Sequence, residues 1–469
     1  MVPHAQAQAR LGSGRPVRSG QAPGQKVGKT TTEPDRHSQE KGVAVDIGRE
    51  ISRCNRCGFC QAACPVFRAT GHESGVARGR IELLKALLEN RLSAQDDLEQ
   101  TVFNCLLCGS CTTHCFPAIP TAELMVEARK EYIGRVGRKG LHRILFDHLL
   151  PYPQRMRAVA RAASLGSSTG LSDLAAALGL LRIFGHDFPK SHRIALPLPE
   201  RTFRDARPPG LFPGHHKDGP RIAFFVGCGL DLLLPDVAEA TFNLLRSKAS
   251  EVSVLDNGCC GLPAWTYGDI SAARSLAEKN LDRLLAVQPD FVVTDCSSCA
   301  SFLKRYPRLF EEQAVLRERA SAAAGRVRDF VEWAADWPLS ASRVSPHPTI
   351  VTYHDPCHAV RGQGLTAEPR EVLRNFPGLA FREMTEADAC CGGAGSYTFR
   401  HFEISRKVLG RKLDHLERTQ ARILVTSCPS CILQLRYGVR TRQLAVRVCH
   451  LSELLASAGP APSASRTQS

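Results

Sequence analysis

Eight of the nineteen cysteines form two runs with identical spacing, which is a pattern that binds metal. The runs are Cys54, Cys57, Cys60 and Cys64, and Cys105, Cys108, Cys111 and Cys115. In ferredoxins, three cysteines spaced two residues apart bind one [4Fe–4S] cluster, while the fourth cysteine of the run binds the neighbouring cluster. The runs therefore predict two cubane clusters. One is held by Cys54, Cys57, Cys60 and Cys115, and the other by Cys105, Cys108, Cys111 and Cys64.

Zinc is the alternative metal for these runs, because paired CxxC motifs also build tetrahedral thiolate sites. A zinc site uses four ligands in two pairs and would leave the third and fourth thiols of each run unexplained. The spacing therefore favours clusters. About 40 residues separate the runs, more than in a small two-cluster ferredoxin, and the segment Arg80–Asn90 has apolar residues at helical spacing. We expect helices to pack around the clusters.

Ten further cysteines form a second pattern, which occurs twice in the C-terminal half. Each copy has one cysteine after a strand-like apolar run, then a vicinal pair, then a CxxC pair. The copies are Cys228, Cys259, Cys260, Cys296 and Cys299, and Cys357, Cys390, Cys391, Cys428 and Cys431. Corresponding cysteines lie 129 to 132 residues apart, which indicates an internal repeat.

The repeats alternate short apolar runs with helical stretches such as Ile270–Leu285 and Phe402–Arg418. This alternation is typical of α/β layers with parallel strands, and it predicts cysteines at the C-terminal ends of those strands. The predicted fold class is an α+β multidomain protein, in which an α-helical ferredoxin domain with two [4Fe–4S] clusters precedes two tandem α/β cysteine-rich repeats.

The predicted domain boundaries follow composition and the cysteine patterns. In chain order they are a disordered tail (1–45), the ferredoxin domain (46–120), a helical segment (121–206), a Pro/Gly-rich linker (207–220), the first repeat (221–310), a helical connector (311–348), the second repeat (349–455) and a tail (456–469).

Composition excludes several other classes of protein. No stretch reaches the roughly 20 apolar residues of a membrane-spanning helix, and the N-terminus has no apolar signal segment. An odd number of cysteines in a chain of this kind indicates metal or redox chemistry in the reducing cytoplasm rather than disulfides. The net charge is +15, but no nucleic-acid recognition motif is present. Cys449 stands outside every pattern and is predicted to be a buried structural thiol.

The segments NGCCG and DACCGG, together with ARGRIELLKALLE, HDPCH and CCGGAGSY, resemble a known family of iron–sulfur subunits with cysteine-rich CCG domains. That family includes the iron–sulfur subunits of glycolate oxidase, of D-lactate dehydrogenase and of anaerobic glycerol-3-phosphate dehydrogenase, and also heterodisulfide reductase subunits. The resemblance covers residues 50 to 455 and is specific for the family rather than for the substrate.

The resemblance implies a cofactor in each repeat. In heterodisulfide reductase such repeats hold non-cubane [4Fe–4S] clusters through all five cysteines, and both sets of five are complete here. Zinc, a redox disulfide or reduced thiols are the alternatives. His354 and His358 flank Cys357; each is positioned to hydrogen-bond cluster sulfur or carry protons, although simple packing is the commoner role of such a histidine.

The resemblance and the motifs together predict an oxidoreductase subunit that is active only with a flavoprotein partner. Because no nucleotide-binding fingerprint is present, the two-electron chemistry must belong to another subunit. We expect an electron-transfer subunit of a respiratory glycolate or lactate dehydrogenase that passes electrons from an FAD-dependent subunit to a quinone or other acceptor.

Two alternative functions stay open at this point. One is a catalytic subunit, like that of heterodisulfide reductase, that reduces a disulfide or sulfur substrate. The other is a zinc-containing assembly scaffold. The basic charge and the segment Arg143–Arg161 also suggest peripheral contact with the inner face of the membrane or with a partner subunit.

Overall fold

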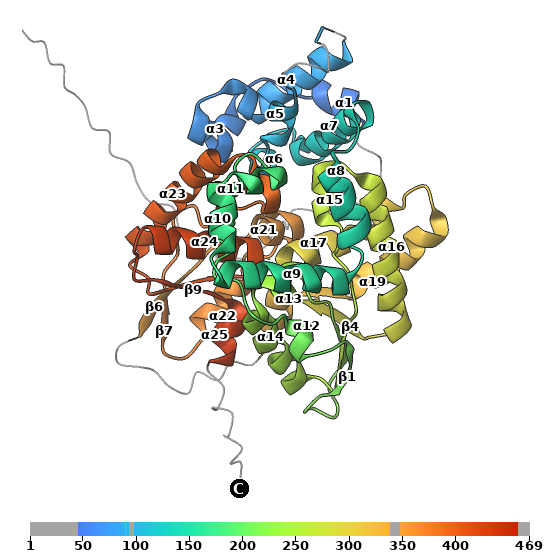
Figure 1. The fold of residues 1–469 in the computed structure, drawn as a ribbon, viewed down its shortest axis with the longest axis vertical. Helices are drawn as coiled ribbons and strands as arrows, with labels where there is room; N and C mark the ends of the chain where they lie inside the picture. The colour runs from blue at the N-terminus through green and yellow to red at the C-terminus, as the bar shows by residue number, and fades with distance from the viewer. Residues whose placement is uncertain (1–45, 90, 93–97, 338–347, 458–469) are drawn as a thin grey trace, which may run out of the picture. The chain divides into compact units, whose positions relative to one another are not determined.

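Helices form the N-terminal part of the chain, and the C-terminal half contains two separate sheets, one mostly and one entirely parallel (Figure 1). The structure, a computed structural model, describes residues 46–89, 91–92, 98–337 and 348–457. The tail predicted at 1–45 lies outside the described residues, as does most of the tail predicted at 456–469. Within the described part, no helix has both the length and the apolar character needed to cross a membrane.

Seven helices surround the two cysteine runs. They are α1 (Ile47–Ser52), α2 (Phe59–Ala63), α3 (Pro65–Thr70), α4 (Ala77–Leu88), α5 (Leu98–Phe103), α6 (Ser110–Thr113) and α7 (Thr121–Val136). The helix predicted over Arg80–Asn90 is confirmed as α4, which buries Ile81 and Leu84 on one face. Both residues belong to a core shared with α5 and α7. This core holds the two cysteine runs side by side.

Further helices connect this domain to the first sheet. They are α8 (Gly140–Arg143), α9 (Pro153–Ser168), α10 (Leu171–Ala177), α11 (Phe188–Ser191) and α12 (Phe203–Ala206). The sequence suggests that the segment Arg143–Arg161 contacts a membrane or a partner, but its residues Phe146, Leu150 and Met156 are buried in the core of the first repeat. Much of the apolar surface of this segment is therefore used inside the chain.

The first sheet has the strand order β1-β3-β2-β4-β5, and only β1 is antiparallel. Its strands are β1 (Gly210–Pro213), β2 (Arg221–Phe224), β3 (Glu251–Val254), β4 (Phe291–Thr294) and β5 (Val327–Asp329). Its helices are α13 (Cys228–Leu233), α14 (Pro235–Lys248), α15 (Leu262–Tyr267), α16 (Ile270–Val287), α17 (Ser297–Lys304), α18 (Tyr306–Leu309), α19 (Ala314–Arg326) and α20 (Phe330–Ala335).

The second sheet is entirely parallel, in the order β7-β6-β8-β9. Its strands are β6 (Thr349–Tyr353), β7 (Leu379–Phe381), β8 (Ile423–Thr426) and β9 (Arg447–His450). Its helices are α21 (Cys357–Gln363), α22 (Glu368–Arg374), α23 (Phe402–Thr419), α24 (Pro429–Thr441) and α25 (Leu451–Ala456). The order β3-β2-β4-β5 of the first sheet is the same arrangement, so the repeated sequence forms a repeated fold.

Two predicted boundaries differ from the structure. Composition predicts a linker over 207–220, but Gly210–Pro213 forms β1, because this short stretch pairs with the edge of β3. The segment 311–348 is predicted to be a helical connector, but it contains β5, the counterpart of β9. A strand of three residues among helices has too little alternation to be recognised from sequence.

Candidate iron–sulfur sites

The four cysteines predicted to hold the first cubane line one cavity. Cys54, Cys57, Cys60 and Cys115 all line this cavity, which Cys111 also borders. Cys57 is exposed, so this site lies near the surface. Gly58 is the N-cap of α2 and has a φ of +86°, a conformation that residues with a side chain rarely adopt. A glycine is therefore needed at this turn between two cysteines.

The four cysteines predicted to hold the second cubane line a neighbouring cavity. Cys64, Cys105, Cys108 and Cys111 all line this second cavity. The last cysteine of each run thus lies with the first three of the other run, which is the grouping expected from the spacing. Burial raises the pKa of Cys111 to about 12, so this thiol is protonated until a metal binds and displaces the proton.

A buried arginine beside the second cavity indicates whether that cavity suits an anionic cluster. Arg80 of α4 borders the cavity and is 2% exposed. Its Nη2 donates to the carbonyl of Asn104 at 2.8 Å, and its Nε has no hydrogen-bond partner within the described residues. A buried cation requires a compensating negative charge. A cluster with thiolate ligands supplies such a charge, whereas neutral thiols do not, so the site fits the cluster.

In the first repeat, the five cysteines follow the ends of β2, β3 and β4. Their thiols are neighbours in the order Cys228, Cys259, Cys260, Cys299, Cys296. Side chains of α16 and α18 form hydrogen bonds with the backbone of the loop that carries the vicinal pair. Asn280 accepts from Gly258 N at 3.2 Å and donates to the carbonyl of Cys259 at 2.9 Å, and the Tyr306 hydroxyl donates to the carbonyl of Cys260 at 2.7 Å. These contacts fix the direction of both cysteines.

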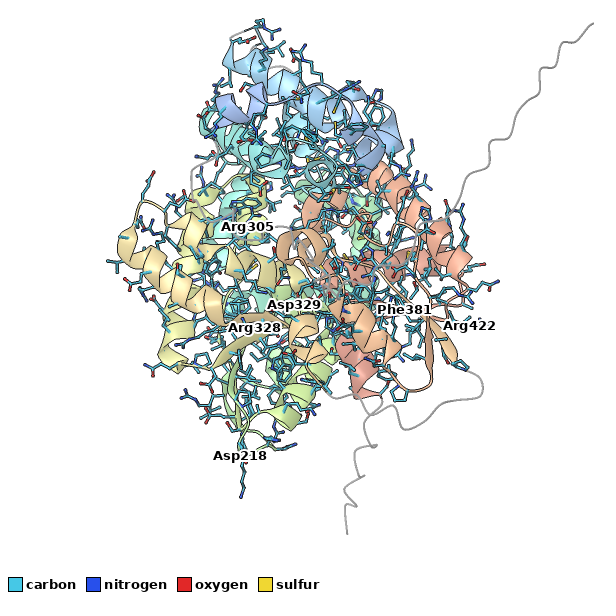
Figure 2. All side chains as sticks on the ribbon, turned by 180° about the vertical axis from the view of Figure 1, so that it is seen from behind. Asp218, Arg305, Arg328, Asp329, Phe381 and Arg422 are labelled. Atoms are coloured by element: carbon cyan, nitrogen blue, oxygen red, sulfur yellow. The ribbon has the colours of Figure 1, made fainter. Side chains whose placement is uncertain are left out.

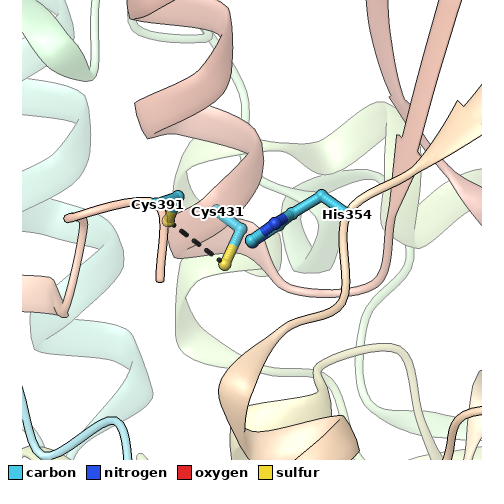
Figure 3. A group of neighbouring side chains, drawn as sticks. All are labelled: His354, Cys391 and Cys431. Atoms are coloured by element: carbon cyan, nitrogen blue, oxygen red, sulfur yellow. Dashed lines mark hydrogen bonds between the residues drawn. The ribbon is translucent and has the colours of Figure 1, made fainter. Parts of the chain in front are cut away.

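In the second repeat, the thiols are neighbours in the matching order. That order is Cys357, Cys390, Cys391, Cys431, Cys428. The Sγ atoms of Cys391 and Cys431 lie 3.5 Å apart (Figure 3). Both are buried, and no disulfide joins them. The prediction that the repeats place their cysteines at strand ends is confirmed, since Cys357 follows β6 and Cys428 follows β8.

His354 points toward Cys391 and Cys431 (Figure 3), and one of its ring nitrogens lies with their sulfurs in a group spanning no more than 4.8 Å. Burial lowers its pKa to about 3, so the imidazole is neutral. Neither ring nitrogen has a hydrogen-bond partner among the described residues. A neutral, unpartnered imidazole beside two thiols fits a metal or a cluster at this position.

His358 lies apart from His354, beside the first repeat. Its Nδ1 lies 2.8 Å from the Ser298 hydroxyl, which in turn lies 3.4 Å from Cys428 Sγ. The sequence predicts that His358 hydrogen-bonds cluster sulfur or carries protons, and in the structure its Nδ1 lies beside the Ser298 hydroxyl. His354, whose ring has no hydrogen-bond partner among the described residues, is the histidine that faces the cysteines.

The two repeat sites meet each other and the second cavity. The Cys296 thiol is a neighbour of Cys428, across a junction where Ser297 N donates to the Ser427 carbonyl at 3.0 Å. Cys108 lies in one cluster of side chains with Cys390 and Cys357. The cysteine groups therefore form one uninterrupted series from the exposed Cys57 to the first repeat.

Contacts between the domains hold this series in place. Arg305, at the end of α17, pairs with Glu123 of α7, and Figure 2 marks Arg305 where the first repeat faces the N-terminal helices. The Tyr397 hydroxyl donates to Asn104 Oδ1 at 2.9 Å, which joins the second repeat to the second cysteine run. At the junction of the repeats, Asp329 (Figure 2) accepts from Gln363 Nε2 at 2.9 Å.

Sequence reasoning missed the charged residues that face the cysteines. Arg80 lies within the motif ARGRIELLKALLE, which indicates only the family, although an arginine within an apolar helix stripe is a signal for a buried charge. Lys412 was also missed. This residue of α23 is 2% exposed and donates to the carbonyl of Ala387 at 3.1 Å, and burial lowers its pKa to about 8. Cys449 is fully buried in β9, as predicted.

The fold and these sites define a modular iron–sulfur protein with a dicluster domain and two cysteine-rich repeats. Family comparisons agree. Residues 50–119 match the 4Fe-4S dicluster domain, residues 222–304 and 351–436 match the cysteine-rich domain, and residues 137–190 match the linker region of the glycolate oxidase iron-sulfur subunit.

Similar proteins cover nearly the whole chain. The probable glycolate oxidase iron-sulfur subunit of Bacillus subtilis (strain 168) is 30% identical over 418 residues, which are 87% of this chain and 94% of that protein. The glycolate oxidase iron-sulfur subunit of Escherichia coli (strain K12) is 27% identical over 86% of this chain and 94% of its own length. A subunit of the CoM/CoB fumarate reductase of Methanothermobacter marburgensis is 27% identical over 87% of this chain and 72% of its own length. The chain belongs to the family of CCG-domain iron–sulfur subunits that includes the glycolate oxidase iron–sulfur subunit, and the predicted resemblance is confirmed.

Proposed function

We propose that the chain is the iron–sulfur electron-transfer subunit of a 2-hydroxy-acid dehydrogenase acting on glycolate or lactate. The observation that supports this proposal best is the uninterrupted series of cysteine groups. Cys111 borders both cavities, Cys108 lies beside Cys390, and Cys296 lies beside Cys428. Redox groups placed in such a series suit electron transfer over a distance.

In this proposal, each cysteine run and each repeat holds one cluster, and iron–sulfur clusters supply one-electron redox chemistry. The chain's own residues hold, orient and bury these groups. The cysteines are the ligands, with Cys115 serving the first cavity and Cys64 the second. His354 contacts the group held in the second repeat.

The flavin and the substrate belong to a partner, because the sequence has no dinucleotide-binding motif. The partner faces the end of the series at Cys57, which is exposed. Next to the cysteines there, Phe59 and Phe116 are also exposed, at 66% and 92%. The acceptor, a quinone or another oxidant, receives electrons from the far end of the series. Peripheral membrane contact stays part of the proposal for the intact complex.

Anaerobic purification followed by measurement of iron, sulfide and zinc, with EPR spectra, tests the proposal. We expect about sixteen irons per chain, since each of four clusters contains four. Ordinary cubane signals should be accompanied by a different signal from the repeats. Addition of an FAD-dependent hydroxy-acid dehydrogenase with glycolate or lactate should reduce the clusters.

The other outcomes separate the alternatives. About eight irons together with zinc would restrict electron transfer to the dicluster domain and give the repeats a structural role. Zinc without iron would contradict the proposal and favour a scaffold. Full iron content with oxidation by a disulfide, but no reduction through a flavoprotein, would favour a catalytic subunit of the heterodisulfide reductase type.

A further inference from the structure

Arg80 and Arg78 lie two residues apart on α4, and each borders a different cysteine cavity. Arg78 borders the first cavity and is about one-third exposed, and it forms an ion pair with Glu73. Arg80 borders the second cavity and is 2% exposed. Among the described residues, no carboxylate lies within ion-pair distance of Arg80. The same helix therefore places an arginine paired with a carboxylate beside the first cavity and, among the residues that the structure describes, an arginine without a nearby carboxylate beside the second.

The placement of Arg80 is costly unless the cavity holds negative charge. Its guanidinium is shielded from solvent, and its Nε has no hydrogen-bond acceptor within the described part of the chain. The groups near it that can carry negative charge are the thiols of Cys105, Cys64 and Cys111, when ionised, and the Tyr397 hydroxyl. An isolated buried cation is strongly disfavoured, whereas one beside a thiolate-ligated cluster is attracted through a low-dielectric medium.

A fixed positive charge acts differently on the two oxidation states of a cluster. Reduction adds one electron and therefore one negative charge, and the attraction to a nearby cation grows by that amount. Burial acts in the opposite direction, because a less solvated site disfavours the more highly charged state. The second cavity is the more buried one, since Cys64, Cys105 and Cys108 are all buried. Burial taken alone would therefore make its cluster the harder of the two to reduce.

We infer that Arg80 is a positioning residue that raises the reduction potential of the cluster held by Cys64, Cys105, Cys108 and Cys111, so that electrons entering at the exposed site are drawn inward. The inference rests on the proposed function, because it requires clusters in both cavities. One electron is gained by this cluster and one is lost by its donor, and no proton transfer is needed. Arg80 supplies the charge and is not a ligand.

The test is an EPR-monitored redox titration of the whole purified chain and two variants. Arg80→Gln keeps a planar hydrogen-bond donor on a shorter side chain and removes the charge. It is expected to lower the ratio of reduced to oxidised second cluster at least tenfold at a fixed potential, equivalent to about 59 mV for one electron. Arg80→Lys keeps the charge and should retain most of the potential.

Arg78→Gln is the matched control, because this side chain is partly exposed and already paired with Glu73. It should change the same ratio less than about twofold, since exposed charges are screened by solvent. Iron per chain is measured for every sample, so that a lost cluster is distinguished from a shifted potential.

An unchanged potential in Arg80→Gln with full iron content would overturn the inference. Loss of the cluster in Arg80→Gln but not in Arg80→Lys would support it, because the cluster would then depend on the charge itself. Loss in both variants would overturn it, since the essential feature would be the guanidinium contact with Asn104. Wild-type protein without two cubanes would instead refute the proposed function, and this inference would fail with it.

Discussion

Replacing Cys108 by alanine is expected to remove one cluster and disconnect the first cubane from both repeats. Cys108 borders the second cavity and packs beside Cys390 and Cys357, so it lies where the dicluster domain meets the second repeat. Iron should fall by about four per chain. Reduction of the repeats by a flavoprotein partner should slow by at least about 100-fold. Removal of a residue that only supports a metal ligand costs up to about 100-fold, and Cys108 is itself a proposed ligand.

Cys449→Ala is the matched control for this experiment. Cys449 is at least as deeply buried as Cys108, and burial raises its pKa to about 12, yet it lies in β9 outside the series. Its replacement should leave iron content and the rate of electron transfer unchanged. If Cys108→Ala kept its iron and its rate, the proposed assignment of the second cavity would be wrong. Rapid-freeze EPR after mixing with the reduced partner measures which clusters receive electrons.

The repeated fold could be predicted from the sequence because its signals are local. Each apolar run ends just before a cysteine, and the runs form β2, β4, β6 and β8. The pairing of Cys64 with the second run and of Cys115 with the first also follows from spacing. Short edge strands escaped prediction, since β1 and β5 owe their conformation to the sheets that they join.

The contacts between sites could not be predicted, because they depend on how separate domains pack. No pattern in the sequence indicates that Cys296 meets Cys428, or that Cys108 meets Cys390. Both repeats have a complete set of five cysteines, but the residues around those cysteines differ. His354 lies three residues before Cys357, where the first repeat has Phe225, three residues before Cys228.

This asymmetry extends to the charges around the two repeat sites. The second repeat places the buried Lys412 beside its vicinal cysteines, and these thiols act on the ammonium group. In the first repeat, α16 presents the neutral Asn280 to the corresponding loop. A cation beside one site and a neutral amide beside the other give the two sites different electrostatic environments. The repeats therefore share a fold without sharing a redox environment.

The largest effect on stability is expected from Asp231→Ala in the first repeat. Asp231 lies in α13, just after Cys228, and forms an ion pair with Arg204 of α12 in which both side chains are 1% exposed. Arg204 also donates to Asn257 Oδ1 at 2.6 Å, and Asn257 donates to the carbonyls of Val226 and Gly258. Removal of Asp231 leaves a buried guanidinium without its carboxylate and should lower the free energy of unfolding by about 3–5 kcal/mol.

The same ion pair links stability to the cluster site. Asn257 directly precedes Gly258 and the vicinal pair Cys259–Cys260, while Cys228 is the first residue of α13. Loosening of Arg204 should therefore release the loop that directs these cysteines, and iron bound by the first repeat should fall together with stability. Denaturant titration and iron analysis of the same samples measure the two effects. A stable variant that retained all of its iron would show that the pair is dispensable.

A double-mutant cycle separates the ion pair from the packing of its members. Arg204→Met and Asp231→Leu remove the charges with little change in volume. The free energy of unfolding of the double variant should be about 1–3 kcal/mol higher than the sum of the two single losses would give. Asp282→Ala provides the exposed comparison, because Asp282 pairs with Arg319 on the surface of the same repeat with side chains 68% and 38% exposed. Asp282→Ala should lower the free energy of unfolding by about 0–1 kcal/mol. Similar losses for Asp282 and Asp231 would contradict the argument, because the predicted difference arises entirely from burial of the charge.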